Sequence, residues 1–384
     1  MSNKNIIFCA DGTWNGSNQP DASQEVVCHT NIYKLFLNLD GKNDFESLNL
    51  ADEQEMTLKD DNQVIQVAKY IHGVGDSRNI INKIFGGAFG SGVIKRIVRG
   101  YTYISRNYNA GDKIFIIGFS RGAYTARALA GLIVSQGLLK KDLTTLENKE
   151  KAYRLAGAAW YKYRKASKKK SILSDLVEVM ADLPAFLSQS SLKDSELIKN
   201  VNIECVAVFD TVGAMGFPNF DNPNEPIDAF QFADLDLSEK VLNGIHAVSL
   251  DEKRAIFSPT LWNDRDEGPI TQVIFSGAHA DVGGGYSIKN NESGLSDITF
   301  VWMKDQLKTL GVIFNNSTQY LITPDPLGVA HKEWIKGIWK VMPIKDRKFP
   351  KYLKLSSTIA DRVDKYVKND PSEKIELYQP ANKP

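Results

Sequence analysis

The sequence predicts an α/β fold in which helices cover both faces of a mostly parallel sheet. Five short apolar runs recur along the chain, each ends in a loop rich in Gly, Asp, His or Ser, and helical patterns separate them. Short strands that are apolar throughout are typical of parallel sheets buried on both faces. Their polar loops meet at one edge of the sheet, where ligands bind. The runs are residues 6–10, 64–71, 114–117, 205–209 and 273–275.

Composition bounds the class of protein. The chain has 384 residues, 42% of them hydrophobic, which is enough for one large domain with a sizeable core. Because 47 basic residues are balanced by 46 acidic ones, no overall field attracts nucleic acid, and no nucleic-acid partner is expected. Three scattered cysteines indicate a reducing compartment. No signal peptide or membrane-spanning stretch is recognisable, so the expected site of synthesis is the cytoplasm, with export by another route left open.

The helical patterns divide the expected single domain, residues 1–384, into parts. A helix is predicted over residues 124–139, and another over 295–312. Between the third and fourth apolar runs lies a charged, mostly helical insertion, residues 141–200. It is expected to form either a lid beside the sheet edge or additional helices packed on the sheet. Residues 316–384 are expected to be an irregular C-terminal tail packed on the domain.

A candidate nucleophile stands between two glycines in "IIGFSRGA", residues 116–123. Ser120 lies where a strand turns into a helix, which is the context that gives a G-x-S-x-G motif its meaning as a nucleophile elbow. Gly118 and Gly122 have no side chain to obstruct the sharp turn. Ser120 is therefore predicted to be a catalytic nucleophile.

The candidate base follows by elimination among five histidines. His29 lies far before the elbow, His72 opens "HGVG", His246 lies in a stretch with a helical pattern, and His331 lies in the tail. His279 alone stands in a loop directly after a buried strand and downstream of Ser120, where an α/β-hydrolase places its histidine. His279 is therefore the predicted general base.

The acid that orients the base is expected between the two in chain order. Asp210 ends the apolar run 205–209, which gives the order Ser120, Asp210, His279 and makes Asp210 the preferred candidate. Two other aspartates compete. Asp251 lies in the helix-like "SLDEKR", and Asp281 is only two residues from His279, where a role in holding the loop suits it better.

The oxyanion of an acyl-transfer reaction needs backbone N–H donors. Arg121, directly after the nucleophile, is expected to supply one. The favoured source of the second is "ADGTWN", with Gly12 or Thr13 as the donor, and "HGVG" is the alternative. Asp11 is expected to cap its own loop. "DVGGGY" lacks the residue order of a phosphate-binding loop and "GGAFGSG" follows no convincing strand, so no metal or cofactor is expected.

With these residues assembled, the chain resembles the uncharacterised-domain family numbered 2235 (DUF2235), a family of α/β-hydrolases that includes the Tle1 phospholipase effectors of bacterial type VI secretion. The matching segments occur in order along nearly the whole chain: "FCADGTWN", "YIHGVGD", "GFSRGAYTARALAGLI", "VAVFDTVGAMG", "HAVSLDEKR", "FSGAHADVGGGY" and "ELYQPANKP". The resemblance implies a lipolytic enzyme with a Ser–Asp–His triad, carried here by Ser120, Asp210 and His279. It also implies export into target cells, with secretion-spike and immunity proteins as partners.

The predicted function is hydrolysis of carboxylic esters, with phospholipid acyl esters as the preferred substrate. An esterase acting on soluble or glycan-borne acyl groups is the alternative within catalysis, and a catalytically silent scaffold is the alternative outside it. Two segments pair aromatic and basic residues, 158–170 and 331–342, and each is a candidate for peripheral membrane contact as well as for ordinary packing. If residues 331–342 were helical, three lysines would share one side of that helix.

Overall fold

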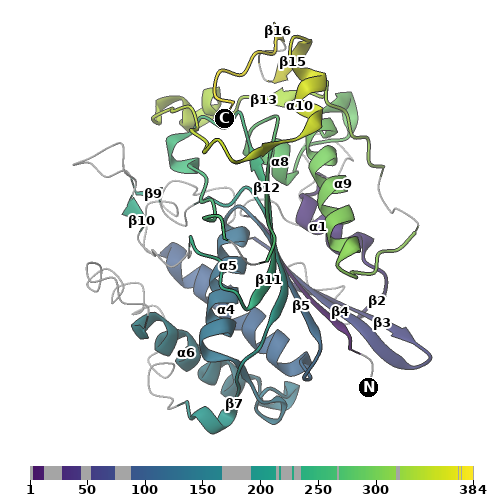
Figure 1. Ribbon diagram of the computed structural model, residues 1–384, viewed down its shortest axis with the longest axis vertical. Coiled ribbons are helices and arrows are strands. Elements are labelled where there is room, and N and C mark those ends of the chain that lie inside the picture. Colours follow the sequence, from purple (N-terminus) through teal and green to yellow (C-terminus); the bar gives the residue numbers. More distant parts are fainter. Residues whose placement is uncertain are drawn as a thin grey trace.

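A central sheet organises the molecule (Figure 1). The computed structural model describes residues 3–12, 28–44, 53–73, 88–166, 192–212, 216–217, 227–228, 235–265, 268–316, 321–370, 372 and 374–383. Within these residues nine strands form the sheet, in the order β14-β12-β11-β8-β5-β1-β4-β3-β2. The strands from β14 to β4 pair in parallel, whereas β3 and β2 are added antiparallel at one edge.

The five apolar runs coincide with five of the parallel strands, so the prediction of a mostly parallel sheet is confirmed. The nine strands of the sheet are β1 (Asn5–Ala10), β2 (Lys42–Asn43), β3 (Glu53–Asp60), β4 (Gln63–Ile71), β5 (Lys113–Phe119), β8 (Ile203–Phe209), β11 (Val241–Ser249), β12 (Ile270–Phe275) and β14 (Lys354–Leu355). Two short pairs lie outside it: β6 (Leu138–Leu139) with β7 (Leu197–Ile198), and β9 (Gly216–Phe217) with β10 (Ile227–Asp228).

Helices cover both faces of the sheet, as Figure 1 shows. On one face lie α4 (Ala88–Asn107), α5 (Arg121–Gln136) and α6 (Lys149–Ala166), and on the other lie α1 (Asn31–Asn38) and α9 (Gly294–Thr309). The short helices α8 (His279–Gly283) and α10 (Ser357–Arg362) follow β12 and β14. None of the described helices is long and apolar enough to cross a membrane.

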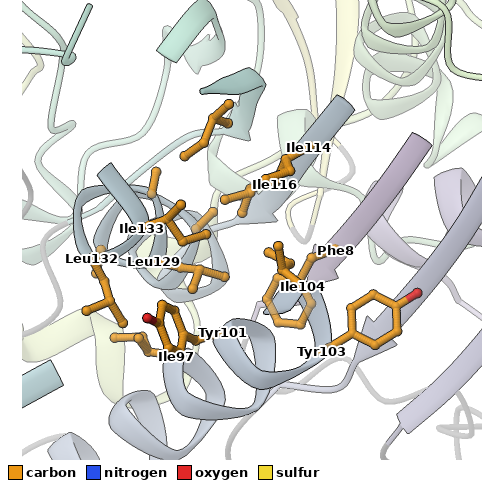
Figure 2. Packing of buried hydrophobic residues seen from close by; sticks show 14 of the residues in the cluster. Phe8, Ile97, Tyr101, Tyr103, Ile104, Ile114, Ile116, Leu129, Leu132 and Ile133 are labelled. Atoms are coloured by element: carbon orange, nitrogen blue, oxygen red, sulfur yellow. The ribbon is translucent and has the colours of Figure 1, made fainter. Parts of the chain in front are cut away.

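Alternating side chains of the central strands fill two separate cores. In β1, Ile6 and Phe8 pack toward α4 and α5, whereas Ile7 and Cys9 pack toward α1 and α9. Figure 2 shows the first core, where Phe8 lies among apolar side chains of α4, α5 and β5. Because both faces are covered, every residue of the strand is buried, which explains the apolar run at residues 6–10.

The insertion at residues 141–200 begins and ends at the paired strands β6 and β7. Its described helix, α6, buries Trp160 and Tyr163 in the core shared with α4 and α5. This part of the insertion packs on the helical layer, and these two aromatic side chains are unavailable to a membrane. Residues 167–191, with the lysine run at 168–170, lie outside the described residues, so a lid stays a prediction.

The C-terminal segment is more regular than expected, and the prediction of an irregular tail is wrong. It adds β14 to the edge of the main sheet and forms a small sheet from β13 (Ala330–His331), β15 (Tyr366–Asp370) and β16 (Ile375–Leu377). Residues 331–342 do not form one helix. They form two short 3₁₀ turns, Glu333–Ile335 and Gly337–Val341, and Lys336 pairs with Glu333 and Asp370 instead of facing solvent with other lysines.

The helix-like pattern around His246 and Asp251 gave a wrong prediction. His246 is a buried residue of β11, which pairs with β8 on one side and β12 on the other, and Asp251 lies in the turn after that strand. Asn243 and Gly244 interrupt the apolar run, and the charged "DEKR" after it imitates the end of a helix. Backbone pairing with two neighbouring strands outweighs this local preference.

Candidate active site

Ser120 lies at the turn between β5 and α5, on the sheet edge where the parallel strands end. Its backbone has φ 57° and ψ −122°, a conformation that costs free energy for a residue with a side chain. The turn is tied to the neighbouring strand because the Ser120 N–H donates to the carbonyl oxygen of Phe209 at 3.1 Å. This is the local geometry of a nucleophile elbow.

Steric contacts explain why both elbow positions, Gly118 and Gly122, are occupied by glycine. A Cβ atom at Gly122 would overlap the carbonyl oxygens of Ala10 and Asp11, and one at Gly118 would overlap the Gly122 carbonyl group. Helix α5 therefore starts in direct backbone contact with the end of β1, and any side chain at Gly122 would push the two apart.

Asp210 and His279 come together from two different strands. Asp210 follows β8, His279 is the first residue of α8 after β12, and His279 Nδ1 lies 2.6 Å from Asp210 Oδ2. This bond directs Nε2 of the imidazole away from Asp210. Nε2 is buried and, among the described residues, has no hydrogen-bond partner, so a hydrogen bond from Ser120 is not formed here.

The surroundings of His279 favour its neutral form. Its ring lies 4.7 Å from the ring of Phe119 and 4.9 Å from that of Phe257, measured between centroids. Burial lowers the pKa of His279, although the carboxylate of Asp210 acts in the opposite direction. A neutral imidazole with an unoccupied Nε2 is able to accept a proton at neutral pH. Since Phe119 precedes Ser120, this contact also places the imidazole beside the elbow.

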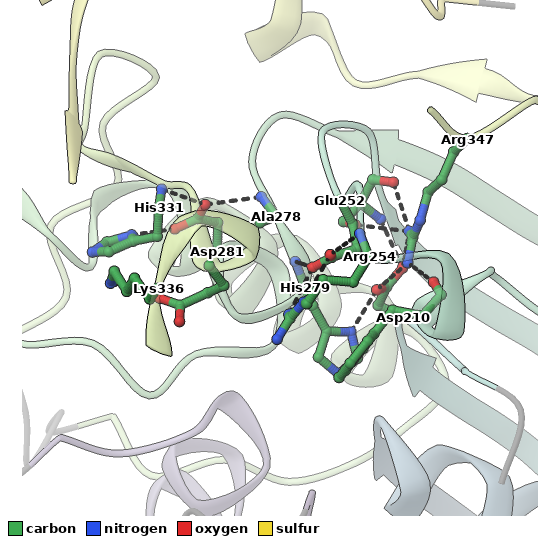
Figure 3. Close-up of polar contacts among 12 residues, drawn as sticks. Asp210, Glu252, Arg254, Ala278, His279, Asp281, His331, Lys336 and Arg347 are labelled. Atoms are coloured by element: carbon green, nitrogen blue, oxygen red, sulfur yellow. Dashed lines mark hydrogen bonds and ion pairs between the residues drawn. The ribbon is translucent and has the colours of Figure 1, made fainter. Parts of the chain in front are cut away.

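Arg347 bonds both oxygens of the Asp210 carboxylate, including Oδ2, which His279 also contacts (Figure 3). Its Nη1 donates to Oδ1 at 2.7 Å and its Nη2 to Oδ2 at 2.9 Å, and the N–H of Ser249 donates to Oδ1 at 2.9 Å. Burial alone would raise the pKa of Asp210, but Arg347 and His279 hold it well below its usual range. Asp210 is therefore a fully buried, ionised carboxylate held by three partners.

Sequence reasoning missed Arg347 and a second pair beside it. Glu252 and Arg254 form a two-bond ion pair, with Nε to Oε1 at 2.9 Å and Nη2 to Oε2 at 2.8 Å. Glu252 Oε2 also accepts the backbone N–H of His279 at 3.2 Å. Both residues belong to "HAVSLDEKR", a segment singled out only for its resemblance to the family. Arg347 stands in a lysine-rich stretch where nothing in the sequence distinguishes it.

The competing aspartates have other partners. Asp281 accepts the N–H of Ala278 at 2.8 Å and pairs with Nδ1 of His331 at 2.6 Å, so it joins α8 to the C-terminal segment (Figure 3). Asp251 accepts the N–H of Gly277 at 2.7 Å and the hydroxyl of Tyr378 at 2.8 Å. The structure records no bond from either carboxylate to the imidazole of His279, whereas it does for Asp210.

The predicted oxyanion donors lie in two places. Arg121 is the first residue of α5, directly after Ser120. Gly12 lies against the elbow, since a Cβ there would come within 3.3 Å of Ser120 Cβ, but its N–H donates to Oδ1 of Asp11 at 2.6 Å. Thr13 and the second half of "HGVG", residues 74–75, lie outside the described residues. Asp11 holds its loop as expected: its Oδ2 also accepts the hydroxyl groups of Thr30 and Tyr70, each at 2.7 Å, and burial raises its pKa to about 6.

Comparison with known families agrees with this geometry. Residues 4–306 match the family described as "T6SS, Phospholipase effector Tle1-like, catalytic domain". The chain belongs to this Tle1-like family. The resemblance found in the sequence motifs is thereby confirmed, and the Tle1-like match extends from before β1 into α9, so it includes Ser120, Asp210 and His279.

Individual relatives of this Tle1-like chain are distant. An uncharacterised protein of Saccharomyces cerevisiae is 28% identical over 257 residues, which cover 67% of this chain and 32% of the yeast protein. An uncharacterised protein from Pseudomonas aeruginosa has 18% identity and a TM-score of 0.44, covering 81% of this chain and 46% of that one. The Tle1 effector bound to the VgrG spike has 18% identity and a TM-score of 0.38, covering 76% and 52%. The chain thus spans a third to a half of these proteins.

Proposed function

We propose that this protein is a serine hydrolase that cleaves the acyl ester bonds of phospholipids, with Ser120, Asp210 and His279 as its catalytic triad. The observation that supports it best is the 2.6 Å bond between Asp210 and His279, next to a serine in the strained backbone conformation of an elbow. Family membership supports the same reaction class, because the family is described as a phospholipase effector.

In the proposed reaction, Nε2 of His279 accepts the proton of the Ser120 hydroxyl while the serine oxygen attacks the acyl carbonyl carbon. The oxyanion that forms accepts a hydrogen bond from the N–H of Arg121 and a second from Gly12 or Thr13. For Gly12 to take part, its N–H would have to leave the Asp11 carboxylate. The imidazolium then gives its proton to the leaving alcohol, and water releases the acyl group from Ser120.

Asp210 has two tasks in this reaction. It accepts the Nδ1 proton of His279, so Nε2 is the nitrogen that is free to act as base, and its negative charge stabilises the imidazolium. Because the positively charged Arg347 bonds both oxygens of the carboxylate, Asp210 stays ionised throughout.

A role in type VI secretion is part of the proposal. It rests on the description of the family and on the solved structure of one distant relative, the Tle1 effector bound to a VgrG spike. The expected partners are a spike protein for delivery into target cells and an immunity protein in the producing cell. Co-purification of the chain with spike proteins encoded nearby would test this role separately from catalysis.

A fluorophosphonate probe tests the reaction class. It should label Ser120 covalently, and Ser120→Ala should abolish labelling and ester hydrolysis while leaving the fold intact. The loss in rate should be large, on the order of 10⁶-fold by analogy with serine proteases. Labelling of another residue, or labelling that persists in the alanine variant, would rule out Ser120 as the nucleophile. Hydrolysis of dispersed phospholipid compared with short soluble esters then separates a phospholipase from a soluble-ester esterase.

A further inference from the structure

The segment at residues 341–354 exposes apolar and basic side chains together, and we call it the basic apolar segment. Val341 is 81% exposed, Ile344 60% and Tyr352 52%. Five basic residues and one acidic residue occur in these 14 positions, although the formal charge of the whole chain is only +1. The one acidic residue, Asp346, pairs with Lys253 at 2.9 Å, outside the segment. The exposed lysines are Lys345, Lys348, Lys351 and Lys354.

Backbone bonds fix the basic apolar segment against the loop that follows β11. The N–H of Lys345 donates to the carbonyl of Lys253 at 2.7 Å, and the N–H of Ala255 donates to the carbonyl of Pro343 at 3.0 Å. Arg347 is the one basic residue of the segment that is buried, and it ends on Asp210. A segment that exposes apolar and basic side chains is therefore fixed beside the candidate triad, to which its buried Arg347 is bonded.

A second contact leads from the same region to the imidazole. Trp339, two residues before Val341, lies 5.7 Å from the ring of Phe257, and Phe257 lies 4.9 Å from the ring of His279. Figure 1 shows the chain after α9 gathered at the end of the molecule where α8 lies. Whatever binds the basic apolar segment thus lies at the same end as His279.

We propose that the basic apolar segment docks the protein on an anionic phospholipid bilayer, with Val341, Ile344 and Tyr352 entering the interface and the lysines contacting lipid phosphates. This inference rests on the proposed function, for which the bilayer is the substrate. Positive charge beside exposed apolar side chains matches such a surface, which combines negative headgroups with an apolar interior. Docking there would bring the triad to the membrane.

Flotation with vesicles tests the proposal. Full-length Ser120→Ala protein, which should not consume lipid, is mixed with vesicles of phosphatidylcholine alone or with 30 mol% phosphatidylglycerol, a composition of about one anionic lipid in three. Binding should require the anionic lipid and weaken as salt rises. Replacing Lys345, Lys348 and Lys351 by Gln should weaken it by roughly 100-fold, about fivefold for each lysine. Replacing Val341 and Ile344 by Ser should weaken it without removing its dependence on salt.

A matched control lies elsewhere on the surface. Ile375 is 68% exposed on β16 beside Lys374, so Ile375→Ser with Lys374→Gln changes the same residue types away from the segment and should leave flotation unchanged. Flotation independent of anionic lipid, or equal in the parent and both segment variants, would overturn the proposal. Fluorophosphonate labelling of the protein with Ser120 intact is read separately, so failure of docking is distinguishable from failure of the proposed reaction.

Discussion

The guanidinium of Arg347 bonds both carboxylate oxygens of Asp210, although 137 residues separate the two in the chain. The same guanidinium donates to the carbonyl oxygens of Ser249 at 2.8 Å and Phe257 at 2.5 Å. The cation of Arg347 balances the charge of this buried carboxylate, which would otherwise lie beside a neutral imidazole without a counter-charge of its own. The C-terminal segment is therefore a structural part of the candidate active site.

Arg347→Ala should lower kcat/KM by roughly 10- to 100-fold and reduce the free energy of unfolding by about 3 kcal/mol, because Asp210 loses its buried counter-charge. The acid limb of the pH profile should move to higher pH. Without the arginine, the charge of Asp210 acts more strongly on the imidazolium and raises the pKa of His279, which then protonates sooner as pH falls. Measuring kcat/KM against pH checks this direction.

A purely structural role for Arg347 predicts lower stability and no movement of the acid limb. Two controls separate the readings. Arg347→Lys keeps the positive charge but loses the two-bond geometry. The acid limb should therefore stay near its position in the parent, whereas kcat/KM should fall. Free guanidinium added to the alanine variant should restore part of the activity. An unshifted profile in Arg347→Ala would show that Arg347 does not tune the base.

The sequence predicts best those strands that are buried on both faces of the sheet. Strands β1, β5 and β8 are buried on both faces, so the apolar run alone reveals them. Strand β11 is equally central, yet Asn243 and His246 break its apolar pattern because their side chains bond neighbouring segments of the fold. Asn243 donates to the carbonyl of Glu204, and His246 accepts the N–H of Thr211. A window of local sequence cannot contain such partners.

The residues of the candidate site likewise include some that the sequence predicts and some that it does not. Ser120 and His279 are recognisable because each follows a strand in a loop of small residues, and Asp210 follows from chain order. Arg347 has no such local signal, since its function depends on a contact with a distant strand end. The glycine next to Asp11 illustrates a further limit: sequence suggests Gly12 as an oxyanion donor, but only the structure shows its N–H bonded to the neighbouring carboxylate.

Acid should destabilise the protein through His246. Its Nε2 accepts the N–H of Thr211 at 3.1 Å inside the sheet, and burial lowers its pKa to about 3. In the unfolded chain His246 takes up a proton near pH 6.5, whereas in the folded chain it does so only near pH 3. The contribution of His246 to the free energy of unfolding is therefore largest above about pH 6.5 and decreases as the pH falls toward 3. The slope should reach about 1.4 kcal/mol per pH unit for this one group.

Urea unfolding at pH 7, 6 and 5 measures this dependence. His246→Gln, which does not titrate, should be less stable at pH 7 but should show a shallower decline toward pH 5. If the variant and the parent decline in parallel, His246 is not the group responsible. His29, whose pKa burial lowers to about 4, should then be replaced next, because its predicted dependence has the same sign.

Gly122→Ala should destabilise the elbow strongly, by about 2 kcal/mol or more, because the added methyl group meets backbone oxygens of Ala10 and Asp11 that cannot move aside. Gly244→Ala is the matched control. Its methyl group would meet the end of the Leu237 side chain, which can change rotamer, so the loss should be smaller. Thermal unfolding compares the two variants directly. Equal losses of stability in the two variants would mean that the contact between α5 and β1 is no tighter than the contact at Gly244.

The choice of acid can be tested by replacing each aspartate with asparagine. Asp210→Asn should cut turnover by about 10³- to 10⁴-fold in folded protein, because the amide favours the wrong tautomer of His279 and cannot stabilise its imidazolium. Asp281→Asn should instead weaken the bonds to Ala278 and His331 and lower the free energy of unfolding by about 1–3 kcal/mol. Its activity should stay within about tenfold of the parent, since His279 keeps Asp210 as its partner.

Asp251→Asn, which affects Gly277 and Tyr378, should behave like Asp281→Asn. Turnover is compared at a temperature where all three variants are fully folded by circular dichroism, and a larger loss for Asp281→Asn than for Asp210→Asn would assign the catalytic acid to Asp281.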